Sequence, residues 1–470
     1  MARLGDIIQM LPLLESLPVD ENITLICDAV VSDWAELLPN IGEIRPIDTA
    51  LWRSQCIQGP VHLPEMLSEL RELSDLDAGE FNQVFALNDH SATDALTALY
   101  WFKSPHIWLT SELLLMRSYL RAMAWFRPVG RIHLADLWRY LAKQPTRRRS
   151  LETTVPEKGT HFAKNVLSPL YQQGLTRIFA FLLGSGGHNR RISPQTWAGY
   201  WNAIQQHGDI GLVLLGAKSE LSVADGFYGS LYGNSQAVLN LIGKTSPLET
   251  LGVLKEIDGI VSVDTGPLHW AAALKTPLVG IYFAEAGLYE TGPYGQNHWA
   301  LAPSCRDYPC SSAMAERCQY QCRSYFEETT DMGNLIYTLL HPDSTSAGSL
   351  PQNIELYRSY SQDGENHFRN LSGLSDHPEA ENLARYCKGI LQDTPEIRNG
   401  PIHAHPLLDK FYETWTAELT TLPLPLNVPM QIRENQRKTA LRRLQTMKPP
   451  QPGAKTINQT LQDRACASYC

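Results

Sequence analysis

A short stretch of this chain combines a buried strand, polar groups and a helix of small residues. It reads Val263-Asp264-Thr265-Gly266-Pro267-Leu268-His269-Trp270-Ala271-Ala272-Ala273. Free N–H groups and a partial positive charge at the start of a helix hold phosphates. Thr265 and Gly266 would offer donors there without a bulky side chain, and His269 can face the same point from the first helical turn. The pattern predicts a phosphate site, and an ordinary capped turn with a core histidine is the equal alternative.

Four cysteines form a second candidate site. Cys305, Cys310, Cys318 and Cys322 lie within 18 residues, and nine cysteines occur in all. The spacing is typical of a tetrahedral thiolate site for zinc or iron, although it is looser than in a zinc ribbon. Free thiols and disulfides are the alternatives. Cys466 and Cys470 are expected to be ordinary exposed thiols.

Apolar runs and helical patterns alternate in two successive α/β regions that would position these residues. In the first region, strands are expected at 23–27, 84–87 and 107–109, with helices at 7–16, 64–73 and 93–101. In the second, strands are expected at 178–183, 211–216, 259–264 and 277–282, with a helix at 194–206. Nearly all-apolar strands are typical of parallel sheets covered on both faces. Functional loops then follow the carboxyl ends of the strands.

Composition changes define the expected domain boundaries. Residues 1–150 form a first Rossmann-like domain, and a polar surface linker is expected from Thr146 to Lys164. Residues 165–345 form a second such domain, which includes the cysteine cluster 305–322. Residues 346–446 are expected to be a mostly helical extension, and 447–470 a disordered tail.

The overall composition limits the classes of function. The chain has 470 residues and a net charge of −9, which argues against a general nucleic-acid-binding protein. No apolar run reaches the roughly 18 residues of a membrane span, and the first residues do not resemble a signal peptide. We therefore expect a cytoplasmic protein.

Six ordered motifs resemble glycosyltransferase family 9, the ADP-heptose:lipopolysaccharide heptosyltransferase family. The stretch around Asp264 is similar to its D-[ST]-G-P-x-H-x-A-A-A element. The other five are Arg3-Leu4-Gly5-Asp6-Ile7-Ile8-Gln9-Met10-Leu11-Pro12, Arg190-Arg191, Leu215-Gly216-Ala217-Lys218-Ser219-Glu220, Asn240-Leu241-Ile242-Gly243-Lys244-Thr245-Ser246 and Thr291-Gly292-Pro293-Tyr294-Gly295. Ile192-Ser193 departs from the family's Trp-Pro. Family members also begin with a strand before Gly5, so we expect the true start to lie upstream.

The resemblance implies a GT-B fold, in which the first domain binds the acceptor and the second binds a nucleotide sugar. It implies inverting transfer without a required metal, with Asp6 as general base beside Gly5; helix capping is the alternative role for Asp6. The donor would be bound by Asp264, Thr265, Gly266, Pro267 and His269. Arg190 or Arg191 would neutralise the departing diphosphate, and Glu220 would accept a hydrogen bond from ribose.

Other polar residues receive weaker interpretations. Lys244, Thr245 and Ser246 either cap a helix or lie near the nucleotide. His90, Ser91, His133 and Asp136 are expected on the surface of the first domain. A related branch, the protein-modifying autotransporter heptosyltransferases, also carries a cysteine-ligated metal, which favours metal here and allows a protein acceptor.

The combined expectation is an enzyme that moves a heptose-like sugar from an ADP-sugar to a hydroxyl of a lipopolysaccharide core or another surface glycan. It would work in the cytoplasm or at the inner face of the cytoplasmic membrane, with peripheral membrane association. The alternatives are a nucleotide-sugar epimerase or hydrolase of the same fold, and a degenerate nucleotide-sugar-binding protein whose C-terminal helices bind a partner.

Overall fold

The computed structural model describes ten segments of the chain. They are residues 4–18, 22–48, 81–88, 108–142, 153–185, 190–341, 350–373, 378–394, 405–424 and 428–449. The helices predicted at 64–73 and 93–101, His90 and Ser91, and the tail from residue 450 with Cys466 and Cys470 lie outside the described residues.

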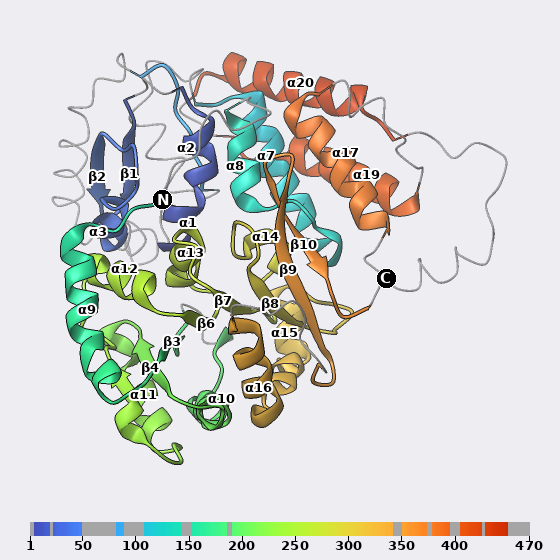
Figure 1. Cartoon of the computed structure of the whole chain (residues 1–470). Helices are drawn as coiled ribbons and strands as arrows, with labels where there is room; N and C mark the ends of the chain where they lie inside the picture. Colours follow the sequence, from blue (N-terminus) through green and yellow to red (C-terminus); the bar gives the residue numbers. More distant parts are fainter. Residues whose placement is uncertain are drawn as a thin grey trace, which may run out of the picture.

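The second domain is built on a parallel sheet with helices on both faces (Figure 1). The strand order β5-β4-β3-β6-β7-β8 is continued by the antiparallel strands β9 and β10. The parallel strands are β3 (Arg177–Leu182), β4 (Ile210–Leu215), β5 (Val238–Asn240), β6 (Gly259–Val263), β7 (Leu278–Ile281) and β8 (Trp299–Pro303). The four strands predicted in this region are therefore confirmed.

Alternating side chains of these strands enter two separate hydrophobic cores. In β3, Ile178 and Ala180 join one core, whereas Phe179 and Phe181 join the other. The first core includes α9 (Glu157–Gln172), α12 (Pro247–Glu256) and α13 (Gly266–Ala273). The second includes α10 (Pro194–Ile204), α11 (Leu221–Tyr228) and α16 (Thr329–Leu340). Burial on both faces explains why the strands are apolar throughout.

The order of the strands reverses between β3 and β6. These neighbours are parallel, and Leu182 pairs with Ser262 near their carboxyl ends. The loops that leave β3 and β6 therefore emerge side by side. In open α/β sheets such a switch point is where ligands bind, so the topology itself marks the place where the Asp264 stretch lies.

The described part of the first domain contains a two-stranded parallel sheet and several helices. Strand β1 (Thr24–Asp28), which the sequence predicts, pairs with β2 (Glu43–Ile47). The helix predicted at 7–16 is two helices, α1 (Leu4–Gln9) and α2 (Leu11–Ser16), with Pro12 in the first turn of α2. The remaining helices are α3 (Ser32–Ala35), α7 (Ser111–Met123), η4 (Arg127–Val129) and α8 (Leu134–Leu141).

Two strand predictions in this domain are wrong within the described residues. Residues 84–87 form no strand, and Trp108 and Leu109 lie in a turn before α7. Thr110 accepts a hydrogen bond from the backbone N–H of Leu113 at 3.2 Å and caps that helix. Trp108 and Leu109 are nevertheless buried. Short apolar runs indicate burial more reliably than strand structure.

The linker prediction also needs correction, because α9 occupies 157–172. Its polar sequence hides a narrow buried face formed by Gly159, Ala163, Leu167 and Leu170. A methyl group added at Gly159 would lie 2.7 Å from the carbonyl oxygen of Leu248. Small residues therefore let α9 and α12 pack backbone to backbone, and the helix needs few large apolar side chains.

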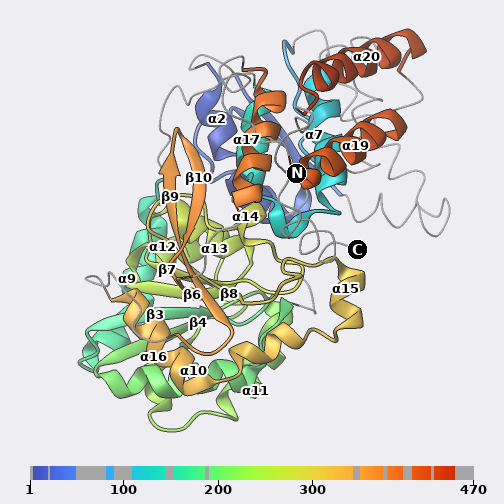
Figure 2. The same cartoon turned by 90° about the vertical axis from the view of Figure 1, so that its right-hand side faces the viewer.

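The C-terminal extension is mostly helical but begins with a β-hairpin. Strands β9 (Ile354–Gln362) and β10 (Glu365–Asn370) extend the sheet at β8 where the sequence analysis expected helix. Both turn residues, Asp363 and Gly364, have positive φ angles (53° and 77°). Asp-Gly between alternating polar and apolar residues is a strong hairpin signal. The hairpin reaches from the sheet toward the first domain (Figure 2).

Helices α17 (Pro378–Gln392), α19 (Pro406–Thr421) and α20 (Met430–Thr446) follow the hairpin and pack beside the first domain (Figure 1). The indole N–H of Trp415 donates to Ser118 Oγ at 2.9 Å, and Trp415 stacks edge-on against Tyr119. Arg443 lies 3.5 Å from Glu112 of α7. The extension thus folds back on the first domain. None of the helices in the described ranges is long and apolar enough to span a bilayer.

Candidate active site

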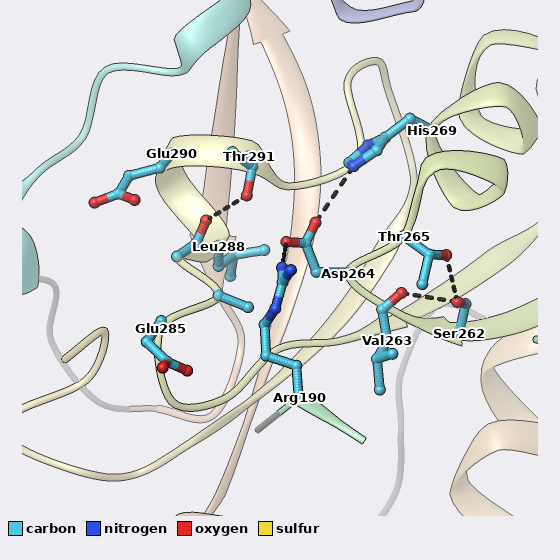
Figure 3. Close-up of polar contacts among 12 residues, drawn as sticks. Arg190, Ser262, Val263, Asp264, Thr265, His269, Glu285, Leu288, Glu290 and Thr291 are labelled. Atoms are coloured by element: carbon cyan, nitrogen blue, oxygen red, sulfur yellow. Dashed lines mark hydrogen bonds and ion pairs between the residues drawn. The ribbon is translucent and has the colours of Figure 1, made fainter. Parts of the chain in front are cut away.

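Asp264 is the centre of a small charged cluster at the switch point. It directly follows β6, and its Oδ2 accepts a hydrogen bond from Arg190 Nη1 at 2.7 Å. Its Oδ1 lies 3.3 Å from His269 Nε2 (Figure 3). The side chains of Arg190, Asp264 and His269 are 25%, 11% and 5% exposed. The structure thus brings together three residues that the sequence assigns to donor binding.

The start of α13, where the sequence predicts a phosphate site, has no side-chain cap. Thr265, the N-cap residue, makes no side-chain hydrogen bond to the helix. Ser262 Oγ donates to the carbonyl oxygen of Val263, so the Thr265 hydroxyl, 2.8 Å away, donates to Ser262 Oγ (Figure 3). With the threonine hydroxyl turned away, no side-chain cap covers the helix start, where Gly266 and Pro267 are the first residues.

The first domain meets this helix start through α1. A methyl group added at Gly5 would lie 3.0 Å from His269 Cδ2, and one added at Gly266 would lie 2.5 Å from Leu4 Cγ. Asp6, the next residue of α1, accepts a hydrogen bond from Asn88 Nδ2 at 3.3 Å. It lies in the first turn of this helix. Asp6 and the predicted phosphate site consequently both lie at the contact between the two domains.

Glu220 and Arg191 occupy the ends of β3 and β4. Glu220 Oε2 accepts a hydrogen bond from the backbone N–H of Ala217 at 2.8 Å. Its carboxylate lies directly over Gly184 and Gly216, where no other side chain would fit. Arg191 donates to the carbonyl oxygen of Ser185 at 3.1 and 3.2 Å. Arg191 therefore braces the loop after β3, and only Arg190 reaches the Asp264 cluster.

Lys244, Thr245 and Ser246 make local contacts. Ser246 and Glu249 form a capping box at the start of α12, so the capping role of Ser246 is confirmed. Lys244 Nζ donates to the carbonyl oxygen of Asn240 at 2.9 Å, and the hydroxyl groups of Thr245 and Thr250 are 2.8 Å apart.

One segment of the second domain, residues 285–295, receives several polar contacts from the described part of the first domain. Arg127 forms a bidentate pair with Glu290 at 2.9 and 2.7 Å. It also donates to the carbonyl oxygens of Glu285 and Cys310, both at 2.6 Å. Arg131 lies over the ring of Tyr289 at 3.9 Å. These contacts fasten the connection between β7 and β8 to the η4–α8 region.

His133 and Asp136 belong to the same contact and are not on the surface, as the sequence analysis expected. They are 1% and 2% exposed. His133 Nδ1 accepts from the backbone N–H of Ala135 at 3.1 Å, so Nε2 carries the hydrogen that is donated to the carbonyl oxygen of Gly292 at 2.9 Å. Asp136 Oδ1 accepts from the hydroxyl of Tyr294 at 2.7 Å. Two polar residues three positions apart at the start of a helix are compatible with a surface in solvent and equally with a surface that packs on another domain.

Burial controls the ionisation of both groups. It lowers the pKa of His133 to about 4 and so keeps the imidazole neutral. Burial, followed by the negative charge of Glu365, raises the pKa of Asp136 to about 6, against the opposing charge of Arg139. The contact between the domains thus contains titratable groups that are held far from their ordinary ranges.

Arg127 also contacts the segment of the four clustered cysteines, through the carbonyl oxygen of Cys310. Cys310 and Cys322 are buried, Cys305 is half-buried and Cys318 is exposed. Burial, followed by the neighbouring Cys322 and Cys318, raises the pKa of the Cys310 thiol to about 12. Throughout the described ranges, no three His, Cys, Asp or Glu residues are grouped so that they could hold a metal ion. A metal at these cysteines stays a prediction, which metal analysis of the purified protein would test.

Several residues at the contact between the two domains were not predicted from the sequence. Gln9 is one helical turn after Asp6 and its side chain contacts His269 and Thr291. Arg127, Glu290 and Tyr294 join the domains, as described above. Gln9 and Tyr294 lie inside quoted motifs and could have been found there. Arg127 and Glu290 carry no local signal, because neither belongs to a motif.

The sequence was compared with known protein families and with curated proteins. Residues 133–323 match the sequence profile of glycosyltransferase family 9 (heptosyltransferase). The segment begins at His133 and includes Arg190, Glu220, Asp264 and His269, whereas Asp6 lies outside it. No curated protein matches the sequence.

Of the similar solved structures, the one with a TM-score above 0.5 supports the fold. A glycosyl transferase family 9 protein from Veillonella parvula DSM 2008 is 16% identical with a TM-score of 0.51, covering 72% of this chain and 94% of its own. E. coli ADP-heptose lps heptosyltransferase II is 16% identical (TM-score 0.45; 62% and 86% covered). E. coli heptosyltransferase WaaC with ADP is 17% identical (TM-score 0.43; 63% and 91% covered). The family profile and the shared fold confirm the resemblance of this chain to glycosyltransferase family 9, the heptosyltransferase family.

Proposed function

We propose that this protein transfers a heptose-like sugar from an ADP-sugar to a hydroxyl group of a lipopolysaccharide core or another surface glycan. The family profile supports glycosyl transfer. The observation that carries the proposal is the Arg190–Asp264–His269 cluster, which lies at the switch point of the second domain and faces the start of α1. The proposed anion site on one domain would therefore adjoin the Asp6 carboxylate on the other.

The donor would bind through the second domain. Its diphosphate would lie at the uncapped start of α13, where backbone N–H groups and Arg190 compensate negative charge as the diphosphate departs. Glu220, at the end of β4, would accept hydrogen bonds from the ribose hydroxyl groups. No step of this scheme requires a metal, and a metal at the four cysteines would be structural, so transfer is expected to survive EDTA.

Asp6 would act as the general base. It would take the proton from the acceptor hydroxyl as that oxygen bonds to the anomeric carbon. The bond between the anomeric carbon and the diphosphate oxygen breaks on the opposite face, so the configuration inverts and the nucleoside diphosphate leaves with the bonding electrons. Contact between the domains would exclude water, which competes with the acceptor.

The first experiment identifies the donor. ADP-, GDP- and UDP-sugars are compared by thermal shift, because a ligand that binds only the folded protein raises its melting temperature. We expect the largest increase with ADP-heptose. A panel in which no nucleotide sugar stabilises the protein would contradict the proposed donor site.

The second experiment tests transfer and the role of Asp6. Asp6→Asn is expected to lower transfer by at least about a hundredfold, typical for the loss of a general base, and to leave ADP binding within about twofold. Near-normal transfer by this variant would refute the base assignment. Consumption of donor without any acceptor would favour the epimerase or hydrolase alternative, and binding without turnover would favour a degenerate binding protein.

The location of the acceptor adds to the proposal. A glycolipid acceptor would place the enzyme at the inner face of the cytoplasmic membrane by peripheral association, and a protein acceptor would not require this. Transfer assays with a detergent-dispersed glycolipid and with a soluble protein acceptor separate the two cases.

A further inference from the structure

The β9–β10 hairpin connects the sheet of the second domain with the first domain. Residues 354–358, at the base of the hairpin, pair with β8. Glu365 lies at the other end, next to the turn, and is 7% exposed. Its Oε1 accepts hydrogen bonds from Arg139 Nη2 at 3.2 Å and from the Tyr140 hydroxyl at 2.6 Å, and both donors belong to α8. A carboxylate carried by the sheet of the second domain is therefore held by a helix of the first.

The same carboxylate also contacts the C-terminal extension. Lys388 Nζ lies 2.5 Å from Glu365 Oε2, and Gln392 Nε2 donates to Oε1 at 2.9 Å; both residues belong to α17. Burial alone would raise the pKa of Glu365, but the charge of Lys388 and the hydrogen bonds from Lys388 and Tyr140 lower it below its ordinary value. Glu365 is therefore ionised at neutral pH, and one buried charge joins three parts of the chain.

A second carboxylate belongs to the same contact. Asp136 of α8 accepts a hydrogen bond at 3.1 Å from the backbone N–H of Asn366, the residue after Glu365. Arg139, whose side chain is 0% exposed, lies 3.6 Å from Asp136 and 3.2 Å from Glu365. Two acids thus face two cations, Arg139 and Lys388, and the charges of this buried group balance when both acids are ionised.

We propose that the β9–β10 hairpin fixes the relative orientation of the two α/β domains, and that the Glu365 carboxylate is the contact on which this depends. Because the base of the hairpin belongs to the sheet, a rotation of one domain against the other would separate Glu365 from Arg139 and Tyr140. Loss of one partner leaves a buried charge uncompensated, which is strongly unfavourable. The inference goes beyond the proposed function, since it depends on neither the donor nor the acceptor.

The backbone N–H of Asn366 reports whether this contact opens. Asn366 is 4% exposed and donates across the contact to Asp136, so its amide hydrogen exchanges with solvent only when the two separate. Proteins that interconvert between two conformations commonly populate the minor one at about 0.1–10%. In the native protein, hydrogen exchange followed by NMR should therefore show this amide protected by more than about a thousandfold. Weaker protection would overturn the proposal.

Two substitutions on different elements test the anchor. Glu365→Gln and Lys388→Met are each expected to increase the exchange rate of the Asn366 amide at least about tenfold, typical for a lost hydrogen bond to a charged group. Amide groups of β3 and β6 should exchange within about twofold of the native rate, because the sheet does not open. The double variant loses one charge of each sign, so it should exchange no faster than the faster single variant.

Glu355 provides the matched control. It is a glutamate of the same hairpin, and its side chain accepts hydrogen bonds from Tyr357 and Asn370 within that hairpin. Glu355→Gln is expected to leave the Asn366 exchange rate within about twofold. The proposal fails if neither single variant reaches a tenfold increase, if their effects add in the double variant, or if β3 and β6 accelerate as much as Asn366. If Glu365→Gln does not fold, Lys388→Met alone gives the same comparison.

Discussion

The position of the Glu220 carboxylate makes Gly184 the most informative residue to change. A methyl group at Gly184 would lie 1.4 Å from Glu220 Oε1 and 1.9 Å from its Cδ. Neither distance is compatible with non-bonded atoms, so Gly184→Ala must displace the carboxylate. Glu220 is the end of a flexible side chain, and its displacement breaks the hydrogen bond from the Ala217 N–H. We therefore expect the free energy of unfolding to fall by only about 1 kcal/mol.

The expected effect on nucleotide binding is larger. Under the proposed function, Glu220 accepts hydrogen bonds from ribose, and hydrogen bonds to a charged group contribute about 1.5–3 kcal/mol. Their loss corresponds to roughly ten- to 150-fold weaker binding. Calorimetric titration with ADP measures this directly. Glu220→Ala should weaken ADP to the same extent, and the double variant should bind no more weakly than Glu220→Ala alone, because the new methyl group then displaces nothing.

A second glycine provides the control. Gly229 follows α11 with a φ angle of −64°, and a methyl group there would meet no atom closer than 3.5 Å. Gly229→Ala is expected to bind ADP as the native protein does. The reasoning fails if Gly184→Ala binds ADP within about twofold of the native protein while Glu220→Ala does not. It also fails if the losses of the two single variants add in the double variant.

Two further predictions concern stability. Arg127→Ala removes the donor of Glu290 and of two carbonyl oxygens. Because the side chains of Arg127 and Glu290 are only 17% and 29% exposed, we expect the free energy of unfolding in urea to fall by about 2–4 kcal/mol. A decrease below about 0.5 kcal/mol would show that these contacts do not hold the domains together. Burial lowers the pKa of His298 from 6.5 to about 4. As the pH falls below 6.5, only the unfolded chain gains a proton, so the stabilisation from the neutral buried His298 is present at pH 7 and is lost toward pH 4. Between pH 7 and pH 5, the free energy of unfolding of the native protein should fall by about 2 kcal/mol more than that of His298→Asn. Equal decreases in urea unfolding would contradict this prediction. His133 acts with the same sign and Asp136 with the opposite sign, so only the difference between variant and native protein is interpreted.

The strands of the second domain could be predicted because parallel strands must be apolar on both faces. Runs such as 178–183 and 259–264 have the length and the apolar composition of strands that are buried on both faces. The positions of Asp264 and Arg190 then follow, because the carboxyl ends of neighbouring parallel strands share one edge. The resemblance named Arg190 or Arg191, and the structure adds that β3 and β6 are neighbours and that Arg190 contacts Asp264.

The first domain was harder to predict because its apolar segments are short. Trp108 and Leu109 are buried without any strand, and their burial depends on the neighbouring helices. In the polar sequence of α9, small residues replace large ones at the contact with α12. Patterns of large apolar residues cannot reveal such faces. The hairpin at Asp363 and Gly364 is different, since its turn signal was available and was overlooked.

Contacts between the domains could not be predicted, because they join residues that share no local pattern. Gln9 and Thr291 are separated by 282 residues, and Arg127 and Glu290 by 163. The match to family 9 begins at His133 and therefore covers the donor side, whereas Asp6, Gln9 and Arg127 precede it. Under the proposed function the first domain must recognise the acceptor. An acceptor different from that of other family members would then be recognised by residues of the first domain, most of which lie outside the matched range. Replacing residues of α1 other than Asp6 should therefore change acceptor preference before it changes donor affinity.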